Sequence, residues 1–90
     1  MTTQLSEAQV QELRSHVQEL LDAECRRRNV GFMLKIVEEF FQEGEILSFI
    51  VVPDREGVRA WDYADVLSKV EIKLRREEHR DLLLVPALPD

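Results

Sequence analysis

The sequence predicts a small α+β domain, in which an N-terminal helical hairpin packs on a two- to three-stranded sheet containing a β-α-β crossover. Two segments carry complete helix-start signals, and two others are short apolar runs typical of buried strands. A chain of 90 residues has room for one domain. We therefore treat residues 1–90 as one unit, with loose tails expected at 1–5 and 87–90.

The first helix is expected over residues 7–28. Ser6 can cap it, Gln9 can reach back to Ser6, and Leu5 can pack on Val10. The apolar residues that follow recur at helical spacing, opposite a polar face: Val10, Leu13, Val17, Leu20, Leu21 and Cys25.

The basic run at 26–28 suits a helix C-terminus, and Asn29 supplies a break. Residues 32–43 then fit two structures. As a helix, the segment places its apolar residues on one face and stops at Gly44. As a strand, it alternates at first but carries Glu38 into the core. The helical template matches more positions, so a second helix is expected here, with a strand as the open alternative.

Residues 46–52 read Ile-Leu-Ser-Phe-Ile-Val-Val, which is typical of a strand buried on both faces. Turn residues follow at 53–57, and 58–61 is expected to form a short return strand. A last buried strand is expected at 82–85.

The third helix is expected over residues 63–79, between the two apolar strands. Asp62 is assigned as its cap, and Trp61 is expected to pack on Val66. A helix that connects two strands in this order predicts a parallel crossover.

Composition excludes several functional classes. The net charge of −6 disfavours general binding to nucleic acids or to anionic membranes, because both need clustered positive charge. Cys25 is the only cysteine, so no internal disulfide or multi-cysteine zinc site is possible. No secretory leader or membrane-length apolar run is visible, and a cytoplasmic protein with a reduced thiol is expected.

One pattern has chemical content. Asp54 follows Pro53, and Glu71-Ile72-Lys73 comes later, which resembles the PD-(D/E)xK nuclease signature. In that family the acidic residue and the Glu-x-Lys pair lie on neighbouring strands and hold a divalent metal for phosphodiester hydrolysis. The resemblance implies a site made of Asp54, Glu71 and Lys73. In the alternative interpretation, Asp54 is a turn residue, and Glu71 and Lys73 are solvated residues of a helix.

The other polar candidates have structural explanations. Neither His16 nor His79 shares a metal-ligand spacing with the other histidine or with Cys25, so no metal and no cofactor are expected. Cys25 continues an apolar stripe, which predicts a buried thiol and not a nucleophile paired with histidine. An acidic cluster is either a solvated face or a docking surface for a basic partner: Glu38, Glu39, Glu43 and Glu45.

These observations favour a non-enzymatic protein-interaction module, such as an adaptor, regulator, inhibitor or small subunit. The alternative is a metal-dependent nuclease or a relic of one, and a third hypothesis is a ligand sensor with a pocket under Trp61 and Tyr63. A homodimer is expected, because a narrow apolar sheet leaves a face or an edge to be covered. A different protein covering that surface is the competing expectation.

Overall fold

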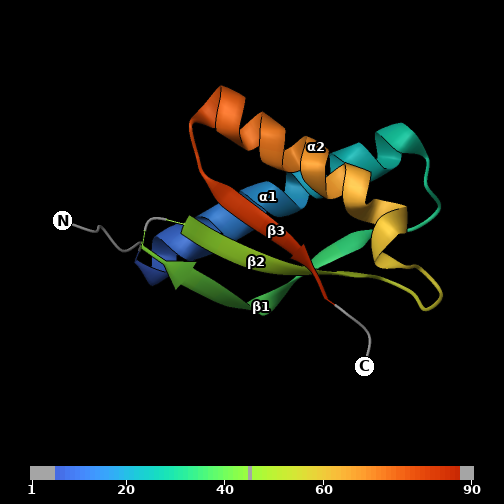
Figure 1. The fold of residues 1–90 in the computed structure, drawn as a ribbon, viewed down its shortest axis with the longest axis horizontal. Coiled ribbons are helices and arrows are strands. Elements are labelled where there is room, and N and C mark those ends of the chain that lie inside the picture. Colours follow the sequence, from blue (N-terminus) through green and yellow to red (C-terminus); the bar gives the residue numbers. More distant parts are fainter. Residues whose placement is uncertain (1–5, 45, 88–90) are drawn as a thin grey trace.

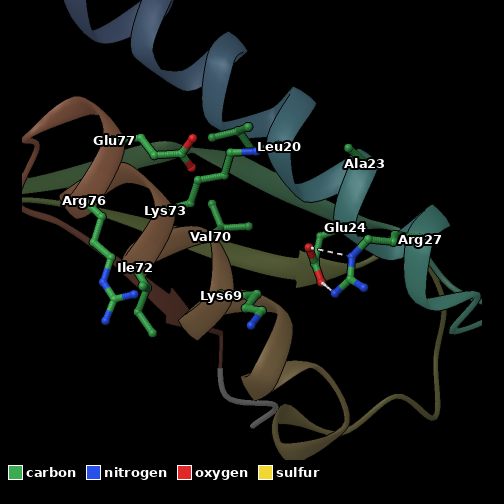
Figure 2. A pocket seen from close by; sticks show the side chains of 10 residues that line it. All are labelled: Leu20, Ala23, Glu24, Arg27, Lys69, Val70, Ile72, Lys73, Arg76 and Glu77. Atoms are coloured by element: carbon green, nitrogen blue, oxygen red, sulfur yellow. Dashed lines mark hydrogen bonds and ion pairs between the residues drawn. The ribbon is translucent and has the colours of Figure 1, made fainter.

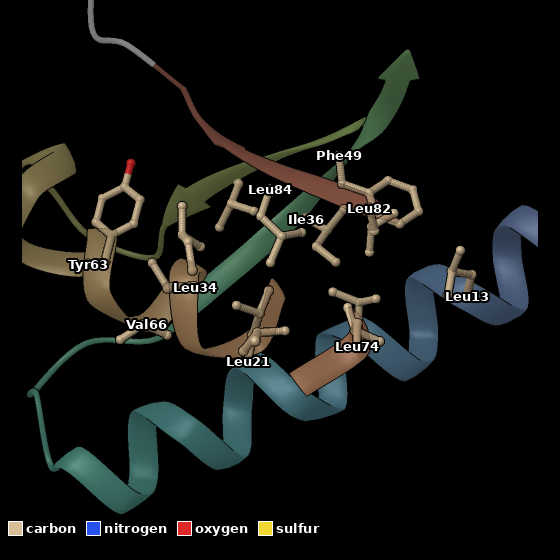
Figure 3. Close-up of a cluster of buried hydrophobic side chains, with 14 of the residues drawn as sticks. Leu13, Leu21, Leu34, Ile36, Phe49, Tyr63, Val66, Leu74, Leu82 and Leu84 are labelled. Atoms are coloured by element: carbon tan, nitrogen blue, oxygen red, sulfur yellow. The ribbon is translucent and has the colours of Figure 1, made fainter. Parts of the chain in front are cut away.

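Residues 6–44 and 46–87 are described by the computed structural model, and they form two layers. The elements follow in the order α1 (Glu7–Arg28), β1 (Leu34–Glu43), β2 (Ile46–Pro53), α2 (Ala60–Glu78) and β3 (Leu82–Pro86). Both helices lie on the same side of the sheet (Figures 1 and 3). The α+β class is therefore confirmed.

The sheet has three strands in the order β1-β2-β3, so β2 is central. β1 and β2 are antiparallel, with Glu43 opposite Ile46 at the hairpin end. β2 and β3 are parallel, with Leu47 opposite Leu82, and α2 connects them. The predicted β-α-β crossover is thus present.

The helix expected over 32–43 is wrong, because this segment contains strand β1. A register shift between Ile36 and Phe40 interrupts the alternation of the strand, so that Glu38 is exposed and does not enter the core. Because of this irregularity, the apolar residues of the segment recur at the spacing typical of a helix and do not alternate as in a regular strand. Gly44, read as a helix stop, has φ 60° and follows directly after β1. The predicted helical hairpin is therefore a single helix followed by a β-hairpin.

The start of α1 is as predicted. The Ser6 hydroxyl accepts a hydrogen bond from the backbone N–H of Gln9 (3.2 Å), and the Gln9 carboxamide accepts one from the Ser6 N–H (2.8 Å). Asn29 ends the helix in the left-handed conformation with φ 53°. The expected contact of Leu5 and the N-terminal tail lie outside the described residues. At the other end, Ala87 still donates to the Val51 carbonyl (3.0 Å), so the chain is held to the sheet one residue further than expected.

The start of α2 differs from the prediction. The helix begins at Ala60, which removes the return strand expected at 58–61. Asp62 is not the N-cap: it lies in the first turn and accepts a hydrogen bond from the backbone N–H of Arg59 (2.8 Å). Trp61 is 71% exposed, so it does not act as a hydrophobic staple, and the Arg59 guanidinium lies over its ring instead.

One hydrophobic core joins the two layers (Figure 3). It lies between the helices and the inward face of the sheet. From the sheet it takes alternate residues, among them Leu34 and Ile36 of β1, Phe49 of β2 and Leu84 of β3. The helices contribute Val10, Leu13, Val17, Leu21, Cys25, Tyr63, Val66, Leu67, Val70 and Leu74.

We expect Asp62→Ala to lower the free energy of unfolding by about 1 kcal/mol, because the first turn of α2 loses an acceptor for a backbone N–H. Asp62→Asn keeps a side-chain oxygen at this position and should cost less than half as much. Urea denaturation followed by circular dichroism measures both. Equal losses would contradict the hydrogen-bonding role and assign the effect to the charge alone.

Candidate functional site

The face of the sheet that points away from the helices is largely apolar and uncovered. Phe41 on β1 is 59% exposed, and Leu83 and Val85 on β3 are each 42% exposed. Ser48 lies between Phe41 and Leu83 in the strand register. A shallow hollow of about 530 Å³ lies on this face, lined by Phe41, Gln42, Glu43, Ile46, Ser48, Leu83 and Val85. We call this surface the open face.

The outer edge of β1, by contrast, is capped by side chains of α1. The Gln18 carboxamide donates to the Leu34 carbonyl (2.7 Å) and accepts from the Ile36 N–H (3.0 Å), much as a neighbouring strand would. Arg14 donates to the Glu38 carbonyl (2.6 Å) while its guanidinium lies 5.8 Å from the centre of the Phe49 ring. At each of these three positions, a side chain of α1 therefore satisfies one backbone group that an approaching strand would otherwise use.

The outer edge of β3 is capped from α2. Ala87 bonds to β2, so alternation directs the backbone groups of Leu84 and Pro86 toward the outer edge. Glu71 accepts from the Leu84 N–H (2.7 Å), and Pro86 has no N–H to offer. A strand that approached this edge would have to displace Glu71. The open face is therefore the more available surface for association.

The predicted acidic cluster lies on β1. Glu38 and Glu39 are exposed where the strand register shifts, and Glu43 is exposed at the end of the strand. Glu45 lies outside the described residues. The three described carboxylates thus flank the open face along one side, and do not form a compact patch.

The structure does not bring Asp54, Glu71 and Lys73 into the arrangement that the nuclease resemblance implies. Asp54 follows β2, where it accepts from the Met33 N–H (3.1 Å) and pairs with Arg55. The hydrogen bond from Arg55 is the main cause of a lowered pKa for Asp54, and the hydrogen bond from the Met33 N–H lowers it further. Glu71 and Lys73 lie on α2 and not on a strand: Glu71 is bonded to β3, while Lys73 faces α1 (Figure 2). Their positions give the nuclease hypothesis no support.

A second hollow, of about 520 Å³, lies between the two helices (Figure 2). We call it the helix groove. Basic side chains on α2 project around it at the spacing i, i+4 and i+7, namely Lys69, Lys73 and Arg76. Glu24 on α1 accepts hydrogen bonds from Arg27 and Arg28, and these bonds lower its pKa to about 2. The helical spacing of the three basic residues was visible in the sequence, but which helix they face was not.

The remaining candidates serve the fold. His16 pairs with Glu78 (2.6 Å), which ties α1 to the end of α2. Cys25 is nine residues further along α1, about 13 Å away along the helix axis, so the two do not form a nucleophile pair. Tyr63 is buried with its ring against Phe32, whereas Trp61 is exposed, so they do not share a pocket.

Comparisons with known proteins found no match. No family model matches the chain, and no curated protein or solved structure that was searched matches it either. Within residues 6–44 and 46–87, no group of three or more histidine, cysteine, aspartate or glutamate side chains is arranged to hold a metal ion. Neither helix in these ranges is long and apolar enough to cross a membrane.

The ion pairs of Glu24 should make stability depend on pH. Its pKa is lowered from 4.5 to about 2, so the stabilisation is complete above pH 4.5 and is lost as the pH falls toward 2. We expect Glu24→Gln to be less stable at pH 7 by about 1 kcal/mol, because paired charges on a helix surface contribute modestly. Urea titrations at several pH values measure the difference, which should vanish near pH 2. A difference that is constant across this range would contradict the ionic role.

The Cys25 thiol should be unreactive in the folded protein. The residue is 2% exposed, and burial raises the pKa of its thiol, so little thiolate is present at pH 8. Labelling with a chromogenic disulfide reagent should be slow for the native chain and should accelerate by more than about a hundredfold in denaturing urea. Native labelling at the denatured rate would show an accessible thiol.

Proposed function

We propose that this protein is a small non-enzymatic protein-interaction module that forms a homodimer through the open face. The observation that carries the proposal is the uncovered apolar surface centred on Phe41, Leu83 and Val85. Apolar sheet faces of this kind are stabilised by packing against a second sheet. Two-fold association of the same face on two copies is the commonest arrangement for such a surface.

The size of the face sets the expected affinity. Three strands about 4.8 Å apart and eight residues of β2 at about 3.4 Å each give a face about 14 by 27 Å, or roughly 400 Å² per copy. Two such faces bury about 800 Å² in total, which is below the size of standard specific interfaces and in the range of weak or transient ones. The proposed dimer should therefore dissociate in the micromolar range.

Charge at the two ends of β1 selects one orientation of the copies. Lys35 and Glu43 are both exposed, and the register gives them the parity of Phe41, on the outward side. A two-fold axis that lies between the sheets and runs perpendicular to the strands stacks β1 on β1 with its direction reversed. Lys35 of each copy then lies near Glu43 of the other, and opposite charges meet at both ends. Glu38 and Glu39 would stay at the rim, available to a basic partner.

The proposed module acts in the cytoplasm, where a buried single thiol stays reduced. An interaction role places no demand on catalytic residues, and it agrees with the structural roles found for Asp54, Glu71 and His16. The dimer would present both helical layers outward.

Sedimentation equilibrium from about 1 to 200 μM tests the dimer. We expect self-association for the parent chain and a monomer for Leu83→Lys, because the substitution places an unpaired charge within the apolar interface. Trp61→Lys is the matched control, since it also replaces an exposed apolar residue, at the start of α2, and should leave the dimer intact. A parent chain that stays monomeric and folded at 200 μM would overturn the proposal.

Charge exchange tests the orientation of the proposed dimer. Lys35→Glu and Glu43→Lys should each weaken association several-fold, because like charges then meet at the ends of β1. The double variant should recover most of the lost affinity. Losses that simply add in the double variant would exclude this orientation.

A further inference from the structure

We infer that the helix groove binds an acidic amphipathic helix of a partner protein. The groove lies on the helical layer, on the opposite side of the molecule from the open face (Figures 1 and 2). The inference goes beyond the proposed dimer and does not depend on it. It rests on the shape of the groove, its apolar floor and the sign of its charge.

The floor of the groove is apolar. Leu20 and Ala23 line it from α1, and Val70 and Ile72 line it from α2. Ile72 is 41% exposed, although it belongs to a helix whose other large apolar side chains are mostly buried. An apolar stripe on a partner helix would remove this surface from water.

The rim of the groove is basic in a chain whose net charge is −6. Four basic and two acidic side chains line it, and Glu24 is already paired with Arg27 and Arg28. Lys69, Lys73 and Arg76 make no ion pair within the described part of the chain. Figure 2 shows Lys73 reaching toward Leu20, so its charge borders the apolar floor. The groove therefore complements a ligand that is both apolar and acidic.

The two helices also supply a suitable shape. In Figure 1, α1 and α2 cross each other and run in opposite senses along the long axis of the molecule, and residues of both helices line the groove. A third helix can lie in such a groove, with residues at i, i+3, i+4 and i+7 on the floor and acidic residues toward Lys69 and Arg76. Nucleic acid fits less well, because the site presents few cations, contains Glu77, and has an apolar floor without aromatic side chains.

The probe is a synthetic helical peptide of about 18 residues made of leucine, alanine and glutamate, with leucine confined to one face. Titration into the ¹⁵N-labelled protein, followed by amide chemical shifts, detects even millimolar binding. We expect shifts to concentrate at Leu20, Ala23 and Ile72, and to weaken with added salt. Two control peptides are a scrambled sequence of the same composition and a version with lysine in place of glutamate; neither should bind.

Single substitutions test whether the peptide binds in the helix groove. Lys73→Glu should weaken peptide binding by about tenfold or more, because it reverses a charge at the edge of the floor. Arg80→Glu makes the same change of charge at an exposed position outside the groove and should have little effect. Leu83→Lys should bind the peptide as the parent does, which separates failure of the groove from failure of the dimer.

The inference is overturned by any of three results. The first is an absence of shifts at millimolar peptide, and the second is equal binding of the scrambled peptide. The third is a stronger response of the same residues to a DNA duplex or to anionic phosphatidylserine vesicles, which would assign the groove to another class of ligand.

Discussion

The rest of the structure depends on the central position of β2. A strand hydrogen-bonded on both sides needs two neighbours, and β1 and β3 supply them. Its inward residues, such as Phe49 and Val51, are fully buried against the helices. Both helices pack on the same face of the sheet, so the other face stays exposed. The apolar character of the outward positions is therefore the feature on which the proposed dimer rests.

The edges of the sheet are capped by polar side chains from the helices, whereas its open face is exposed. Gln18 and Arg14 reach from α1 to the edge of β1, and Glu71 reaches from α2 to the edge of β3. Each satisfies a backbone group that would otherwise invite another strand. Leu83 and Val85 on the open face, by contrast, remain exposed in the part of the chain that the structure describes, so this face is more accessible than the two edges.

Charge is also distributed unevenly between the layers. Acidic side chains border β1, whereas the groove between α1 and α2 has a basic rim formed by Lys69, Lys73 and Arg76. A formal charge of −6 for the chain hides this difference, because it averages over both sides of the molecule. The two surfaces have different chemistry and lie on opposite sides, so they can be occupied at the same time. This combination agrees with the proposed role as a protein-interaction module.

Much of the fold could be predicted from local signals. The cap at Ser6, the stripe of α1, the apolar strand β2 and the α2 crossover all follow from residues close together in the sequence. The prediction failed for β1, because a register shift after Ile36 gave the strand the apolar spacing of a helix. It also failed at the start of α2, where Asp62 serves as the acceptor in the first turn instead of the N-cap.

The sequence by itself determined which residues are apolar, where α1 begins, and that residues 46–52 form a strand. The prediction that this strand is buried on both faces was wrong, because its outward residues are not covered and Ile46 is 45% exposed. Only the tertiary structure decided which side of each strand is covered, because this depends on the packing of helices that are distant in the chain. It likewise decided the role of Glu71, which a linear pattern placed in a metal site and the fold places against the Leu84 amide. The same holds for Lys73, because the role of a charged side chain depends on the residues around it. Leu20, which lines the same groove, is over fifty residues away in the sequence.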